Sequence, residues 1–237
     1  MIKAVFFDLD GTLLPMHMNE FVSAYMKALA EKMGALGLNA KKLIDVLWKG
    51  TEAMVKNDGS VTNEKRFWQV YEQEMGTEML RYQPDFEAFY RHEYDKAKEK
   101  AYPTPQAAEL VQFCKDRGLA MVIATNPVFP EVAQQKRIAW AGLNPEDFTY
   151  ITTYENSHYC KPNPAYFQEI LERTGLTAQQ VVMIGNDALE DTAAGKLGIP
   201  VFLLTDYLWN EHHVAIDKYP QGSFEEAKQF IEAQLHA

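Results

Sequence analysis

Five short apolar runs recur along the chain, at residues 3–9, 119–125, 148–154, 180–185 and 199–204. They are rich in β-branched and aromatic residues and lack a regular alternation of apolar and polar positions. Such runs are typical of strands covered on both faces of a sheet. Each run after the first is preceded by a stretch with helical periodicity. The pattern therefore predicts an α/β fold with a doubly wound, Rossmann-like parallel sheet.

A long segment, residues 16–103, separates the first run from the second, and it is far too long for one crossover helix. Apolar positions recur within it at helical spacing in about four stretches. The first three of these helices are expected to stop at Gly34, near Gly59 and at Gly76, and the fourth is expected to follow Pro84. We expect an all-helical unit at 16–103, inserted into a core formed by residues 1–15 and 104–237.

Two helices of the core have recognisable starts in the sequence. Thr104 and Pro105 are suited to the N-cap and the first helical position, and Gly118 is suited to the end of that helix. Thr177 and Gln180 have the spacing of a capping box, which predicts a second helix start.

Polar residues follow three of the apolar runs at the points where the strands are expected to end. Ligands bind at the carboxyl ends of strands in an open parallel sheet, so we expect these side chains to converge. Clustered carboxylates repel one another unless a cation joins them, and oxygen ligands suit Mg²⁺. An isolated pair of acids two residues apart is more often a turn or a helix cap. The residues concerned are Asp8, Asp10, Thr125, Asn126, Asn186 and Asp187.

Composition narrows the possible partners. The 237 residues carry a formal net charge of -10, which opposes binding to nucleic acid or anionic lipid. Two cysteines are too few for a disulfide framework, and no segment has the ~20 apolar residues of a membrane span. We expect a cytoplasmic protein with no nucleic-acid or membrane partner. The oligomeric state is not indicated.

Four motifs occur in a defined order: "DLDGTLL" at 8–14, "ATN" at 124–126, "KPNP" at 161–164 and "GNDALED" at 185–191. Together they resemble the haloacid dehalogenase-like hydrolase superfamily, in its helical-cap phosphatase subgroup. Members of this family carry a helical cap between the first and second motifs, which is where residues 16–103 lie. The resemblance therefore covers the chain from end to end.

The resemblance implies a role for each motif residue. Asp8 would be the nucleophile and Asp10 the general acid and base. Thr125 and Asn126 would bind the transferring phosphoryl group. Lys161 would neutralise charge on that group and on Asp8. The implied Mg²⁺ site draws on Asp8, Asp10, Asn186, Asp187 and Asp191. Asp10 would reach the metal through its backbone carbonyl, and Asp191 would support either the metal or Lys161.

The fourth motif departs from the family pattern. An acid usually follows its glycine directly, whereas here Asn186 follows Gly185 and Asp187 comes next. If this motif aligns with the family motif without a gap, Asn186 is the metal ligand. If the loop is shifted by one residue, Asp187 is the metal ligand. We favour Asp187 because Mg²⁺ prefers an anionic ligand.

The resemblance implies a Mg²⁺-dependent phosphatase that hydrolyses a small phosphomonoester metabolite through an aspartyl-phosphate. A phosphosugar mutase shares all four motifs, and a non-catalytic phosphate-binding or signalling module is a further alternative. Asp10 argues against the metal-free dehalogenases and the phosphonatases of the superfamily, which lack an acid at this position. Lys49, Lys56 and Arg66 of the insert are candidate contacts for an anionic leaving group, although a solvated surface position is the more common one for any single cation. His17 and Asn19 near the start of the insert are further candidate contacts.

Overall fold

The computed structural model describes residues 1–236. Within that range six strands form one sheet in the order β3-β2-β1-β4-β5-β6, and every neighbouring pair is parallel. The chain leaves β1 toward one edge and later returns to the other side of β1, so strand order reverses between β1 and β4. The strands are β1 (Ala4–Phe7), β2 (Ala120–Ile123), β3 (Tyr150–Ile151), β4 (Val181–Gly185), β5 (Val201–Leu204) and β6 (Gln221–Gly222).

The five predicted strands are all present. The edge strand β6 was not predicted, because its two residues, Gln221 and Gly222, carry no apolar pattern. It pairs with the end of β5 at Leu203 and Leu204.

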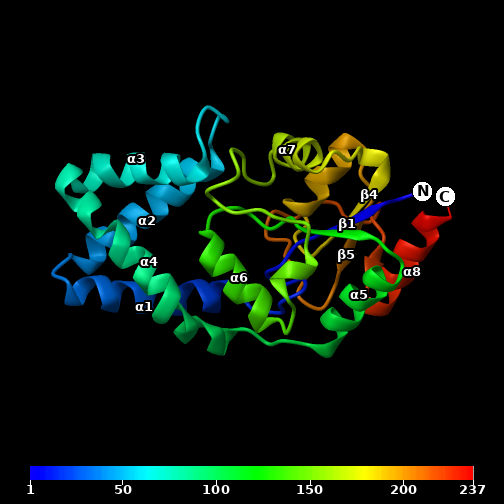
Figure 1. The fold of residues 1–237 in the computed structure, drawn as a ribbon, viewed down its shortest axis with the longest axis horizontal. Coiled ribbons are helices and arrows are strands. Elements are labelled where there is room, and N and C mark those ends of the chain that lie inside the picture. Colours follow the sequence, from blue (N-terminus) through cyan, green and yellow to red (C-terminus); the bar gives the residue numbers. More distant parts are fainter. Residues whose placement is uncertain (237) are drawn as a thin grey trace.

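Helices cover both faces of the sheet, which confirms the doubly wound arrangement (Figure 1). Along β1, Val5 and Phe7 belong to one hydrophobic cluster, with α5 and α8, and Ala4 and Phe6 belong to the other, with α7. Alternate side chains of a strand point to opposite faces, so each face has its own apolar core. The covering helices are α5 (Pro105–Asp116), α6 (Glu131–Trp140), α7 (Pro164–Thr174), η5 (Asp191–Leu197) and α8 (Phe224–Leu235).

A group of helices lies between β1 and α5 in the sequence and beside the sheet in space (Figure 1). The chain enters and leaves this group along two adjacent segments: Met16 bridges Ala101, and the Tyr102 N–H donates to the Pro15 carbonyl at 2.8 Å. The helices are α1 (Met18–Ala35), α2 (Ala40–Val55), α3 (Asn63–Met75), η1 (Thr77–Tyr82), α4 (Gln83–His92) and η2 (Tyr94–Lys100).

Several predicted helix ends are confirmed and others shift. Thr104 caps α5, and α3 ends at Gly76, whose φ of +102° suits glycine. Helix α1 continues one residue past the predicted stop at Gly34. The capping box of Thr177 and Gln180 forms, but it begins only the three-residue 3₁₀ helix η4 (Ala178–Gln180), because β4 starts directly afterwards.

No helix in the described part of the chain is both long and apolar enough to cross a bilayer. Cys114 and Cys160 are buried free thiols. The predicted core extends to residue 237, which lies outside the described residues.

Candidate active site

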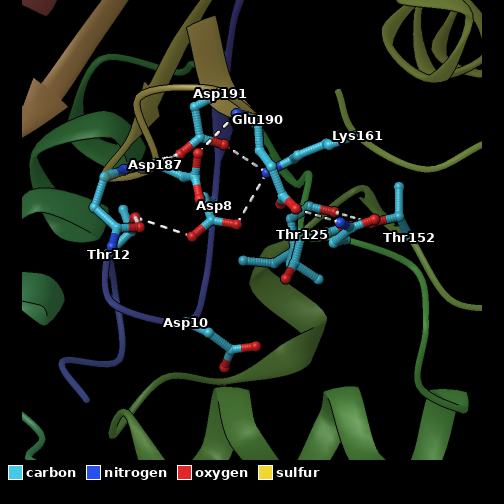
Figure 2. A network of polar contacts seen from close by, with 12 residues as sticks. Asp8, Asp10, Thr12, Thr125, Thr152, Lys161, Asp187, Glu190 and Asp191 are labelled. Atoms are coloured by element: carbon cyan, nitrogen blue, oxygen red, sulfur yellow. Dashed lines mark hydrogen bonds and ion pairs between the residues drawn. The ribbon is translucent and has the colours of Figure 1, made fainter. Parts of the chain in front are cut away.

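Asp8 lies at the carboxyl end of β1, beside the point where strand order reverses. Its backbone N–H still bonds the Ile184 carbonyl of β4 at 2.9 Å, so the sheet fixes its position. Its Oδ1 accepts a hydrogen bond from Lys161 Nζ at 2.9 Å, and its Oδ2 accepts one from Thr12 Oγ1 at 3.0 Å (Figure 2). Both carboxylate oxygens are therefore oriented before any ligand binds.

The turn after Asp8 depends on Gly11. Its φ is +86°, and a Cβ there would lie 2.3 Å from Asn186 Nδ2, so a side chain would collide with the neighbouring loop. The Asn186 side chain links two segments: its Oδ1 lies 2.9 Å from Thr12 Oγ1, whose single proton is shared between Asn186 Oδ1 and Asp8 Oδ2, and its Nδ2 donates to the Tyr207 carbonyl at 2.7 Å. Asn186 thus joins the first and fourth motifs.

Lys161 is fully buried between two carboxylates. Its Nζ lies 2.9 Å from Asp8 Oδ1 and 2.6 Å from Asp191 Oδ1. Burial alone would lower the pKa of Lys161, but the charges of Asp191 and Asp8 raise it well above its usual value. Lys161 is therefore a fixed positive charge beside the Asp8 carboxylate.

Asp191 is also completely buried, and both its oxygens are occupied. Oδ1 accepts from Lys161, and Oδ2 accepts from the backbone N–H groups of Asn186 and Asp187 at 2.9 and 2.8 Å. A Cβ at Gly185 would lie 2.1 Å from Asp191 Oδ2, so the glycine permits this approach. These contacts match the expected support of Lys161 and add a link to the loop of the fourth motif.

Thr125 follows β2 and lines the same cavity as Asp8. Its backbone carbonyl accepts from Thr152 Oγ1 at 2.7 Å and from the Tyr166 hydroxyl at 2.8 Å, which fixes the loop. Its own hydroxyl bonds no group within residues 1–236, so it is available to a ligand. In the Asn126 side chain, Nδ2 donates to Glu190 Oε1 at 2.9 Å, while the buried Oδ1 has no hydrogen-bond partner among the described residues.

Asp10 points away from the group around Asp8 (Figure 2). Its Oδ2 is paired with Arg137 Nη1 of α6, and its buried Oδ1 has no hydrogen-bond partner among the described residues. Burial raises the pKa of the Asp10 carboxyl, and Arg137 acts in the opposite direction.

Asp187 uses one carboxylate oxygen to hold its own loop. Oδ1 accepts from the backbone N–H groups of Leu189 and Glu190, both at 2.7 Å, and Oδ2 bonds no other group in residues 1–236. Burial and the nearby Asp191 raise the pKa of the Asp187 carboxyl. Asp187 therefore offers a free anionic oxygen, whereas Asn186 does not.

The site has an excess of negative charge that suits a hard cation. Burial and the charges of Asp191 and Asp10 raise the pKa of the Asp8 carboxyl despite Lys161. No three His, Cys, Asp or Glu side chains of residues 1–236 are already grouped to hold a metal. Mg²⁺ usually binds one or two carboxylates and keeps several waters, so Asp8 and Asp187 fit it. Burial raises the pKa of Glu190 to about 8. The ionisable groups of the site are Asp8, Asp10, Asp187, Glu190 and Asp191 against Lys161 and Arg137.

Some of these residues were missed from sequence. Thr12, which contacts Asp8, lies inside the first motif, and Glu190, which contacts Asn126, lies inside the fourth. The motifs therefore include both residues, although the sequence assigned neither a role. Arg137 lies in none of the four motifs, and a basic residue near the end of a helix is common on a solvated face, so no feature of the sequence placed it in the site.

Comparisons with known proteins agree with this geometry. A family model for haloacid dehalogenase-like hydrolases matches residues 2–198. A phosphoglycolate phosphatase of Aliivibrio fischeri is 23% identical over 97% of this chain and 95% of its own length. A glyceraldehyde 3-phosphate phosphatase of Methanocaldococcus jannaschii is 26% identical over 83% and 81%.

Solved structures show the same fold at low identity. A HAD phosphatase from Thermococcus onnurineus superposes with a TM-score of 0.59 at 18% identity, covering 97% of this chain and 98% of that one. A 2-haloacid dehalogenase from Pseudomonas syringae superposes with a TM-score of 0.62 at 17% identity, covering 100% of both chains. The chain belongs to the haloacid dehalogenase-like hydrolase family.

Proposed function

We propose that this hydrolase is a Mg²⁺-dependent phosphatase that cleaves a small phosphomonoester through an aspartyl-phosphate on Asp8. The observation that carries the proposal is the Asp8 carboxylate, oriented by Lys161 and Thr12 at the edge of a cavity that also receives the free Thr125 hydroxyl. The relatives named as phosphatases support the same reaction.

The proposed reaction has two steps. Asp8 attacks phosphorus, and the bond between phosphorus and the ester oxygen breaks as Asp10, which has taken up a proton on its unpaired Oδ1 before this step, gives that proton to the oxygen. A water then attacks the phosphorus of the aspartyl-phosphate and gives a proton back to Asp10. The bond to Asp8 breaks, inorganic phosphate leaves, and both carboxyl groups return to their starting states.

Charge stabilisation accounts for the remaining side chains. A transferring phosphoryl group spreads negative charge over its oxygens, and preorganised positive charge and donors lower the barrier. Lys161 supplies a fixed cation, and the Thr125 hydroxyl supplies a donor. Bound Mg²⁺, held by Asp8, the Asp10 backbone carbonyl and Asp187, would add further positive charge at the phosphoryl oxygens.

We also propose that residues 16–103 act as a cap over a core of residues 1–15 and 104–237. The paired crossing segments at Met16 and Ala101 support this division, because a unit joined through two adjacent strands can hinge. The cap would exclude water from the phosphoenzyme. The buried free thiols are compatible with the cytoplasm, which we retain as the proposed compartment.

Acetyl phosphate tests the chemistry without depending on leaving-group recognition. The wild-type protein should release inorganic phosphate from it with added Mg²⁺, and should lose this activity on exhaustive chelation. Asp8→Asn should be inactive although the fold is retained. Full turnover after chelation, or turnover by Asp8→Asn, would contradict the proposal.

A further inference from the structure

A large cavity lies between the helical insert and the carboxyl edge of the sheet. Its volume is about 1650 Å³, and it extends from Asp8 and Thr125 to helices α1, α2, α3 and α4. Small-molecule sites commonly measure ~300–1,000 Å³. The cavity exceeds this range, so the chemical character of its lining is what distinguishes among possible ligands.

Apolar side chains dominate the part of the cavity beyond the catalytic residues. Trp48 and Val55 of α2 remain 51% and 40% exposed, and among residues 1–236 they are two of five large apolar side chains with such exposure. Apolar surface left in water is unfavourable, and a clustered patch of it marks a binding surface. The wall is contributed by both insert and core, through Met26, Trp48, Val55, Trp68, Phe129 and Trp209.

Charged side chains around the cavity are mostly acidic. The cations of its lining in the described chain are Lys27 and Arg91, both exposed, and Arg91 lies 3.9 Å from Glu87. Burial and the charges of Glu155 and Glu87 raise the pKa of the Glu64 carboxyl. Outside the catalytic group the lining acids are Glu31, Glu64, Glu87, Glu131, Glu155 and Asp206.

The insert cations that the sequence offered for an anionic leaving group do not reach the cavity. Each is held by a neighbouring acid on the insert, and none belongs to the cavity lining in residues 1–236. The pairs are Lys49–Glu74 at 2.7 Å, Lys56–Glu52 at 2.5 Å and Arg66–Asp58 at 3.0 Å. His17 and Asn19 do line the cavity, but neither supplies a permanent positive charge.

From this lining we infer that the physiological leaving group is a bulky, largely apolar alcohol or phenol that carries no negative charge. This inference rests on the proposed phosphatase activity and specifies its substrate class. A short carboxylated leaving group such as glycolate would meet repulsion from the lining acids and would leave the apolar wall in water. An uncharged aromatic group would cover that wall and avoid the repulsion.

The effects of leaving-group size and leaving-group charge can be measured separately with three synthetic esters: ethyl phosphate, 2-phenylethyl phosphate and 2-(4-carboxyphenyl)ethyl phosphate. All are esters of primary alcohols, so the chemistry at phosphorus is matched. We expect kcat/KM for 2-phenylethyl phosphate to exceed that for ethyl phosphate by at least ~10-fold, because one methylene alone can contribute that factor. The added carboxylate should remove at least ~10-fold.

Variants on the cavity wall test where this preference arises. Trp48→Ser should lower kcat/KM for 2-phenylethyl phosphate by a larger factor than kcat/KM for ethyl phosphate. Leu36→Ser is the matched control, because Leu36 is 39% exposed on the insert and does not line the cavity. Glu87→Lys should raise kcat/KM for the carboxylated ester, whereas Glu99→Lys, an exposed acid of the insert outside the lining, should not.

The outcomes distinguish this inference from the function on which it rests. No Asp8-dependent hydrolysis of acetyl phosphate would remove the proposed function itself. Hydrolysis of acetyl phosphate combined with a preference for ethyl phosphate, or for the carboxylated ester, would leave the phosphatase intact and overturn the inferred substrate class. An aromatic preference that Trp48→Ser does not reduce would also overturn it, because the apolar wall would then not be the recognition surface.

Discussion

Arg137 and Asp10 form a buried ion pair across 127 residues of sequence, with 2.5 Å between Arg137 Nη1 and Asp10 Oδ2. The guanidinium is fully buried, lies 4.3 Å from the centre of the Phe129 ring and donates through Nη2 to Gln134 Oε1. The side chain proposed as general acid and base is thus held by an arginine that no motif contains. Arg137 does not line the cavity and contacts Asp10, so we regard it as a positioning residue.

Arg137→Met should impair the steps that need Asp10. Removing one partner of a buried pair leaves the other charge uncompensated, which costs about 3–5 kcal/mol of folding stability. We expect turnover of an unactivated ester to fall by at least ~100-fold, the lower range for loss of general acid–base catalysis. Steady-state kinetics and thermal unfolding measure the two effects separately.

A double-mutant cycle shows whether Arg137 acts through Asp10. In an Asp10→Asn background, Arg137→Met should lower kcat little further, since the group that it positions is already gone. Additive losses in kcat would indicate an independent role for Arg137. Arg137→Lys keeps the charge and should recover part of the activity if positioning is the function.

Asp8 and Asp10 should differ in the phosphoenzyme that each variant forms. Asp8→Asn removes the nucleophile, so no phosphoenzyme should appear. Asp10→Asn keeps the backbone carbonyl proposed to bind Mg²⁺ and removes only proton transfer. An activated leaving group needs little protonation, so formation of the phosphoenzyme should be impaired less than its hydrolysis. Phosphoenzyme should then accumulate on Asp8, as detected by intact-protein mass spectrometry after a rapid acid quench. Phosphate on Asp10, or label persisting in Asp8→Asn, would reverse the assignment.

The central sheet could be predicted because its strands are buried on both faces and therefore appear as continuous apolar runs. Residues 4–7 and 181–185 are buried throughout. The edge strand β6 has only Gln221 and Gly222, and its pairing comes from the tertiary contact with β5, not from local pattern. The capping box at Thr177 is a local signal that formed as expected, yet the nearby strand limited it to one 3₁₀ turn.

Position after a strand predicted only some of the site residues. Asp8, Thr125 and Asp187 lie within two residues of the carboxyl ends of β1, β2 and β4, so parallel topology brings them to one edge. Lys161 comes from a loop, and motif order alone indicated it. Arg137 required the fold, because its partner is remote in sequence and no periodicity distinguishes a buried arginine from a solvated one.

Replacing Lys161 should separate its catalytic role from its structural one. Lys161→Met leaves Asp8 and Asp191 facing each other without the cation between them, so we expect a loss of about 3–5 kcal/mol in stability and at least ~100-fold in kcat. The double variant Lys161→Met/Asp191→Asn should recover stability, because one buried charge is removed, without recovering activity. If Lys161→Met alone retained near-wild-type kcat, Lys161 would have only a structural role. Chemical denaturation and phosphate release measure the two quantities.

The last prediction concerns which residue of the fourth motif binds Mg²⁺. Asp187 has a free anionic carboxylate oxygen, whereas Asn186 offers only a neutral amide oxygen, which lies 2.9 Å from Thr12 Oγ1. Asp187→Asn keeps an acceptor for the backbone N–H groups of Leu189 and Glu190 but removes the charge.

We therefore expect Asp187→Asn to weaken Mg²⁺ affinity by at least ~10-fold, the smaller effect recorded for residues that merely support a metal ligand. Asn186→Ala should instead reduce stability, through loss of its bonds to Thr12 and Tyr207, with a smaller effect on affinity. Calorimetric titration with Mg²⁺ alone reads affinity without relying on turnover, and thermal unfolding reads stability. If Asn186→Ala weakens Mg²⁺ binding more than Asp187→Asn does, the gapless register is correct and Asn186 is the ligand.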